Sequence, residues 1–152
     1  PMKRTLEFAI VIDRPVADVY DHLADPQNFL GLQPLLSEMS PIRESTEHER
    51  VVREYETVEA FRLWGRIVYR NRIRVRSTLT NPPARLDTRV HSPGGVTLNV
   101  EYHFAVEGAG TCLTEIMHLE MSALVAGFVV SQATQAQRAV LARLKARLES
   151  VA

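Results

Sequence analysis

Residues 66–79 read RIVYRNRIRVRSTL, and this stretch decides the fold class of the chain. Ile, Tyr, Asn, Ile, Val, Ser and Leu occupy the odd positions from 67 to 79, while arginine occupies most even positions. A period of two indicates a β-strand with one buried and one wet face, which is typical of antiparallel sheets. The odd positions are therefore expected to face a core, and the arginines to face solvent.

Further strands flank this one on both sides. Leu6 to Ile12 alternate in the same way, and Gly, Pro and Asn turns separate the later apolar runs. The run 51–63 carries apolar residues on both faces, so its register stays open. Strands are expected over residues 6–12, 51–63, 67–79, 84–91, 96–106 and 111–122.

The turn before the last strand decides where Glu115 points. A four-residue loop, 108–111, turns Leu113 and Met117 inward and sets Phe104 opposite Glu115. A three-residue loop would instead turn Cys112 and its alternate neighbours inward. We expect the four-residue loop because it buries more apolar surface.

Helices are expected near both ends of the chain. One follows Pro15 and stops at Asp25-Pro26, and a second short one spans 26–30. Residues 123–152 contain no proline and are rich in Ala, Leu, Arg and Gln in their second half, which predicts a long helix. Its inner face at helical spacing would be Leu124, Gly127, Val130, Thr134, Gln137, Leu141, Leu144 and Leu148.

Length and composition are those of one ordinary globular domain, residues 1–152. The chain has 152 residues, with 18 Lys plus Arg against 18 Asp plus Glu, and a single cysteine, Cys112. Zero net charge argues against a nucleic-acid partner, and one cysteine excludes an internal disulfide. The longest apolar run, 123–130, is too short to span a membrane. We therefore expect a cytoplasmic protein with no transmembrane segment.

Residues 16–34, VADVYDHLADPQNFLGLQP, resemble the helix-loop-helix of the START-like, or Bet v 1-like, superfamily and its polyketide cyclase/dehydrase group. The Gly110-Thr111 turn with the strand through Glu115, and the ending LARLKARLE at Glu149, are similar to the same group. The resemblance implies an α+β helix-grip fold. In that fold a curved antiparallel sheet of about seven strands wraps a long C-terminal helix, with two short helices after the first strand. Cyclases, hydroxylases, lipid carriers and sensors share this scaffold, so the resemblance does not choose an activity.

No catalytic or cofactor motif stands out in the chain. It lacks GxGxxG, GxxxxGK[ST], GxSxG and HExxH, and its five histidines have no spacing typical of metal ligands. No metal and no cofactor are therefore expected.

The inward positions carry more polar residues than a packed core would take, since a buried polar group without a partner costs about 1–3 kcal/mol. Tyrosines, hydroxyls and amides on an apolar wall suit a mostly apolar ligand with a few oxygens. The residues expected to bind such a ligand are Tyr55, Phe61, Tyr69, Asn71, Ile73, Thr88, Tyr102, Phe104, Met117, Phe128, Thr134 and Gln137.

Two inward carboxylates are the candidates for catalysis. Glu115 lies between Leu113 and Met117, where burial should raise its pKa, and Glu59 would face Asn71 if the strand 51–63 turns back at 64–66. Either carboxylate could instead be tied to a neighbouring tyrosine or amide, or point to solvent.

The outer arginine row has two interpretations. It could hold an anionic partner, or it is a solvated face in which Arg74 and Arg76 lie opposite Glu56 and Glu54. We favour the solvated face.

Three functions follow from these patterns. The leading one is the binding of a hydrophobic or aromatic small molecule of the polyketide, lipid or isoprenoid class in an internal cavity. The alternatives are a polyketide cyclase, aromatase or dehydratase, and a quinone or lipid carrier whose lid over residues 29–36 meets a membrane. A homodimer is possible in each case.

Overall fold

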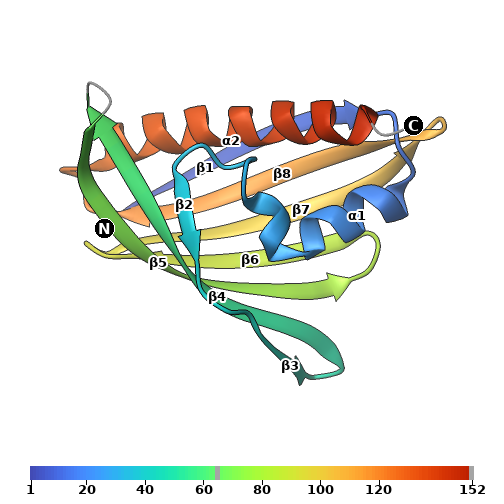
Figure 1. The fold of residues 1–152 in the computed structure, drawn as a ribbon, viewed down its shortest axis with the longest axis horizontal. Coiled ribbons are helices and arrows are strands. Elements are labelled where there is room, and N and C mark those ends of the chain that lie inside the picture. Colours follow the sequence, from blue (N-terminus) through green and yellow to red (C-terminus); the bar gives the residue numbers. More distant parts are fainter. Residues whose placement is uncertain (64–65, 151–152) are drawn as a thin grey trace.

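Eight antiparallel strands form one curved, open sheet in the computed structural model, which describes residues 1–63 and 66–150. The strand order is β1-β8-β7-β6-β5-β4-β2, with β3 paired to β4. A long helix, α2, lies along one side of the sheet, and two short helices follow β1 (Figure 1). The elements in chain order are β1 (Met2–Ile12), α1 (Val16–Ala24), η1 (Pro26–Phe29), β2 (Leu36–Met39), β3 (Arg43–Glu47), β4 (Arg50–Leu63), β5 (Arg66–Asn81), β6 (Arg85–Ser92), β7 (Val96–Glu107), β8 (Gly110–Met121) and α2 (Ala126–Glu149).

This architecture confirms the helix-grip fold, with eight strands where about seven were expected. Six of the eight strands were expected by residue range, and the short strands β2 and β3 were not. β3 reads RESTE and is exposed along its whole length, so it carries no apolar alternation that would mark it in the sequence.

The register between β4 and β5, left open by the sequence, is settled by their pairing. Glu59 lies opposite Asn71, Glu56 opposite Arg74, and Glu54 opposite Arg76. Tyr55 and Thr57 are consequently buried on the concave face of the sheet.

The hairpin between β7 and β8 differs from the prediction. Glu107 pairs with Gly110, so the loop has two residues, and Gly108 supplies the positive φ of 59° that a tight hairpin favours. Tyr102, and not Phe104, therefore lies opposite Glu115. A shift of two residues keeps every side chain on its predicted face, so Glu115 still points inward.

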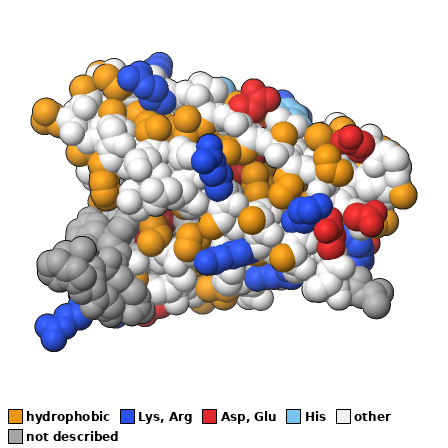
Figure 2. All heavy atoms as spheres, turned by 90° about the horizontal axis from the view of Figure 1, so that it is seen from above, with side chains coloured by type: hydrophobic (Ala, Val, Ile, Leu, Met, Phe, Trp, Pro, Cys, Tyr) orange, Lys and Arg blue, Asp and Glu red, His pale blue; other side chains and the backbone are white. Residues whose placement is uncertain are grey.

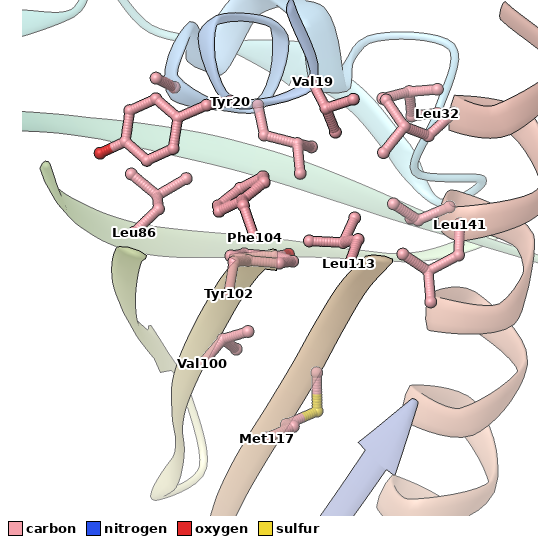
Figure 3. Packing of buried hydrophobic residues seen from close by; sticks show 14 of the residues in the cluster. Val19, Tyr20, Leu32, Leu86, Val100, Tyr102, Phe104, Leu113, Met117 and Leu141 are labelled. Carbon is pink, nitrogen blue, oxygen red and sulfur yellow. The ribbon is translucent and has the colours of Figure 1, made fainter. Parts of the chain in front are cut away.

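The apolar core lies at the end of the sheet beneath α1. Tyr20 and Phe104 meet edge to face with ring centroids 5.0 Å apart, and the Tyr20 hydroxyl donates to the backbone oxygen of Arg85 at 3.0 Å. Figure 3 shows Leu113 beside the Phe104 ring, with Leu141 of α2 on the other side of Leu113. This packing fixes α1 across β7 and closes the interior at that end.

The inner face of α2 follows the prediction in its second half and in part of its first half, where Val130 packs against the core and Gln137 lines the cavity. Leu141, Leu144 and Leu148 are buried as expected, but Leu124 is 96% exposed because the helix begins at Ala126 and residues 123–125 form a turn. The first half also turns inward residues that were not predicted, among them Val129, Ala133 and Ala136. Thr134, predicted to face inward, donates its hydroxyl to the Val130 oxygen of its own helix at 2.8 Å.

Arg147 ties the end of α2 to the segment after α1. Its guanidinium donates to the backbone oxygens of Asn28 at 2.7 Å and Leu30 at 3.1 Å, and lies 3.1 Å from His22 Nε2. Burial and the Arg147 charge lower the pKa of His22, so its ring stays neutral and accepts this hydrogen bond.

Replacing Arg147 by methionine keeps much of the aliphatic stem and removes these hydrogen bonds. We expect Arg147→Met to lower the free energy of unfolding by about 1–3 kcal/mol, because three acceptors lose a charged donor. Urea denaturation followed by circular dichroism measures the change. Arg138→Met, at an exposed position of the same helix, is the matched control. Equal losses in the two variants would contradict a specific role for Arg147.

Candidate ligand-binding site

A cavity of about 640 Å³ lies between the concave face of the sheet, α2 and the segment that contains η1 and β2. Its walls are mostly apolar, with scattered hydroxyls, amides and one carboxylate. Of the residues that the structure describes, no Lys, Arg or His lines it. The polar lining residues are Gln33, Tyr55, Thr57, Glu59, Asn71, Ser77, Thr88, Ser92, Tyr102, Gln132 and Gln137.

The cavity reaches the surface where the turn between β6 and β7 approaches the start of α2. Four residues at this place both line the cavity and are exposed: Pro93, Gly94, Val125 and Phe128. Phe128 is 62% exposed. Figure 2 shows hydrophobic side chains at the surface of the molecule on the face seen from above. The mouth therefore has an apolar rim.

Two tyrosine hydroxyls face the interior. Tyr102 is 4% exposed and Tyr55 is 9% exposed, and neither hydroxyl makes a hydrogen bond to another described residue. Burial raises the pKa of both side chains, and the charge of Glu115 raises that of Tyr102 further. Both hydroxyls remain protonated at neutral pH, so they can donate hydrogen bonds to a ligand oxygen. Figure 3 shows the Tyr102 ring beside Phe104, so Tyr102 both lines the cavity and adjoins the core.

Glu59 brings a carboxylate to the cavity wall. β4 positions it opposite Asn71, and burial raises its pKa to about 7. It makes no hydrogen bond or ion pair with any described residue. The amide nitrogen of Asn71 donates elsewhere, to the Ser92 hydroxyl at 2.6 Å. Glu59 is thus able to take or give a proton near neutral pH and is accessible to a ligand.

Glu115 is buried behind the cavity wall. It is 0% exposed and is not among the residues that line the cavity, whereas its neighbour Gln137 is. With its nitrogen toward Glu115, the Gln137 amide donates to Oε1 at 2.8 Å and to Oε2 at 3.2 Å. Burial raises the pKa of Glu115 to about 8, so the neutral form predominates at pH 7. Gln137 therefore separates Glu115 from any molecule in the cavity.

Most of the predicted binding residues lie together at the cavity. Phe104 lies in the core beside Tyr20, and Thr134 is not among the lining residues. The side chains of Phe61 and Tyr69 fall outside the described part of the chain. The predicted residues that line the cavity are Tyr55, Glu59, Asn71, Ile73, Thr88, Tyr102, Met117, Phe128 and Gln137.

Other lining residues were missed by sequence reasoning. The prediction missed Gln132, Ala133 and Ala136 because part of the predicted inner face of α2 was rotated about the helix axis relative to the observed one. The spacing of Ala136 and Val140, four residues apart and both buried, could have indicated the observed face. Leu35 and Leu36, expected in a lid, do line the cavity, whereas Leu32 is buried in the core.

The arginines of β5 lie on the opposite face of the sheet, and three of them, Arg70, Arg72 and Arg76, have acidic partners there. Arg72 pairs with Glu56 at 2.9 Å, and Arg76 pairs with Glu54 at 3.3 Å and with Glu47. Glu56 thus pairs with Arg72, two residues before the Arg74 that faces it in register. These exposed pairs agree with a solvated face.

Neither a metal cluster nor a membrane-crossing helix is found within the described ranges. No three His, Cys, Asp or Glu side chains of residues 1–63 and 66–150 gather as metal ligands would. No helix in the same ranges combines the length and apolarity needed to cross a bilayer.

Residues 3–149 match the family described as polyketide cyclase / dehydrase and lipid transport. The chain belongs to this family. A comparison with curated protein sequences finds no match. The family assignment agrees with the resemblance seen in residues 16–34.

Solved structures show how widely the fold of this family member is shared. A Thermus thermophilus protein is 16% identical with a TM-score of 0.75, and the match covers 98% of this chain and 100% of that one. The ZhuI aromatase/cyclase of a Streptomyces species is 17% identical with a TM-score of 0.70, covering 97% and 96%. A START superfamily protein of Mycobacterium smegmatis is 8% identical with a TM-score of 0.72, covering 97% and 99%. At these identities the likeness establishes the fold alone.

The buried Glu115 predicts a specific pH dependence of stability. The folded chain holds the Glu115 proton up to a pKa of about 8, whereas the unfolded chain releases it near 4.5. Stability from this group is present below pH 4.5 and is lost as the pH rises toward 8, by about 1.4 kcal/mol for each unit of pKa difference. We expect Glu115→Gln, which cannot ionise, to gain stability relative to wild type as the pH rises from 5 to 8.5.

Urea denaturation at the two pH values tests this expectation. Glu120→Gln, at an exposed position of the same strand, is the control and should show no such trend. A constant difference between Glu115→Gln and wild type would show that Glu115 ionises as freely in the folded protein as in the unfolded chain.

Proposed function

We propose that this protein binds a mostly apolar small molecule, of the polyketide, lipid or isoprenoid class, in the cavity beneath α2. The observation that carries the proposal is the pair of tyrosines, Tyr55 and Tyr102, whose side chains are mostly buried and whose hydroxyls open onto an apolar cavity without a hydrogen-bond partner among the described residues. Each hydroxyl is thus accessible to a molecule in the cavity and can donate a hydrogen bond to it. A ligand oxygen would provide the missing acceptor.

The size and lining of the cavity support the same proposal. A volume of about 640 Å³ is within the usual range of small-molecule sites, about 300–1,000 Å³. Apolar walls with a few placed polar groups are typical of such sites. Family membership adds weight, because the family description covers cyclisation, dehydration and lipid transport.

Filling the cavity should abolish binding. Ala133 lines the cavity from α2, and tryptophan at this position would occupy space needed by a ligand. We expect Ala133→Trp to weaken the binding of Nile red, an uncharged apolar dye, at least tenfold in a fluorescence titration. Ala142→Trp, at an exposed position of the same helix, should bind the dye as wild type does.

Native mass spectrometry of protein purified from its own host complements the titration. A reproducible adduct that is present in wild type and absent from Ala133→Trp would identify the class of the natural ligand. Nile red binding that is equally strong in wild type and Ala133→Trp would contradict the proposed site.

A second candidate function is acid–base catalysis on a bound polyketide, and Glu59 is the observation that favours it. A carboxyl group at the cavity wall with a pKa near 7 can accept a proton from carbon between two ketones. The resulting enolate can attack a further carbonyl of the same chain, and a tyrosine hydroxyl can donate to the oxygen that becomes negative. Ring closure followed by loss of water would complete such a reaction.

Glu59→Gln separates the enzyme from the binding protein. With a synthetic linear poly-β-ketone as substrate, an enzyme should release a cyclised product lighter by one water, detected by mass spectrometry. The variant should lose at least tenfold in turnover while keeping its affinity for Nile red. Glu56→Gln, on the outer face of the same strand, should keep both properties. Turnover at the wild-type rate in Glu59→Gln would exclude Glu59 as the base.

A further inference from the structure

Charge is distributed unequally between the two faces of the sheet, and this bears on which ligand the cavity takes. The interior receives the Glu59 carboxylate and, of the residues that the structure describes, no basic side chain. The arginines of β5 alternate away from it, and Arg72 and Arg76 pair with glutamates on the outer face. Among the described residues, a ligand in the cavity therefore meets the Glu59 carboxylate without a basic side chain to compensate its charge.

Glu59 needs a partner, and the described residues around it do not supply one. Leu36 of β2 pairs with it on one side, and both Leu35 and Leu36 line the adjoining wall. On the other side lies Asn71, whose amide nitrogen is directed to Ser92. An ionised carboxylate in apolar surroundings is destabilised unless a hydrogen-bond donor or a cation meets it.

A ligand carboxylate would be unfavourable at this place for the same reason. It would lose its hydration, find no positive charge among the described lining residues, and lie close to the Glu59 charge. Hydroxyl and ammonium groups have the opposite effect, since each donates a hydrogen bond to Glu59.

We propose that the ligand presents a hydrogen-bond donor, a hydroxyl or a protonated amine, to Glu59 and carries no carboxylate at that end. This inference rests on the proposed function, because it assumes that the cavity is the binding site. The ligand class is thus narrowed to hydroxylated or amine-bearing apolar molecules, and free fatty acids and other apolar carboxylic acids are disfavoured.

Three probes with the same apolar body test the proposal. Pyrenemethylamine, pyrenemethanol and pyrenecarboxylate differ only in the group that would meet Glu59, and pyrene fluorescence reports binding of each. At pH 8, where Glu59 is mostly ionised, we expect wild type to bind the amine at least tenfold more tightly than the carboxylate, with the alcohol between them. Glu59→Gln should bring the amine and the carboxylate within threefold of each other.

Two controls make the outcomes distinguishable. Glu56→Gln should keep the wild-type order, because Glu56 lies on the outer face beside Arg72. Ala133→Trp should weaken all three probes, which locates their binding in the cavity.

The results distinguish failure of the inference about the ligand from failure of the proposed binding function. Carboxylate binding as tight as amine binding, or an order that Glu59→Gln leaves unchanged, would overturn the inference while the cavity remains a binding site. Failure of wild type to bind any probe, together with Nile red binding that Ala133→Trp does not affect, would overturn the proposed function and the inference with it. If Glu59→Gln does not fold, the relative affinities of wild type for the amine, the alcohol and the carboxylate test the inference by themselves.

Discussion

The contact between the second half of α2 and the sheet is the constraint on which the rest of this structure depends. Leu141, Leu144 and Leu148 are buried against β1 and the core beneath α1, and they fix the helix at that end. The first half of α2 presents small side chains, Ala133 and Ala136, to the same concave surface. The cavity lies against this first half of the helix, and Phe128, Val129, Gln132 and Gln137 line it as well.

The interior uses two glutamates on similar apolar walls in different ways. Glu115 is enclosed and its hydrogen bonds go to Gln137, so its raised pKa is a matter of stability. Glu59 faces open space and lacks a protein partner among the described residues, so its raised pKa is available to a ligand. The difference between the carboxylates is accessibility, which is set by a single amide on α2.

The fold and the inward-facing residues were largely predictable from the sequence, because apolar and polar residues alternate regularly along the strands. The alternation over residues 66–79 indicated which face of β5 is buried, and the motif in residues 16–34 indicated the helix-grip fold. The predicted loop between β7 and β8 was two residues too long, but the prediction for Glu115 still held. Side chains in a strand alternate with a period of two, so a register shift of two residues left Glu115 pointing inward.

Features that depend on three-dimensional detail escaped prediction. β3 has no apolar face to detect, and the start of α2 lacks a capping side chain that would have fixed the phase of the helix. Gln137 was predicted to line the cavity, as it does. The sequence did not indicate that its amide also covers Glu115, which depends on the positions of the two side chains. Sequence patterns indicate which face of a strand or helix carries a residue, but they do not indicate whether its side chain is accessible from the cavity.

The open sheet has one further consequence, which concerns its edges. An unpaired strand edge exposes backbone donors and acceptors to which another chain can add a strand, a common route to aggregation. β1 is one edge, and α2 lies alongside it, with Lys145 donating to the Val11 oxygen at 2.6 Å. At the other side β2 has only four residues, and neighbouring β3 is exposed and charged. Short length, charge and a covering helix thus let the sheet stay open around a cavity without recruiting strands from other molecules.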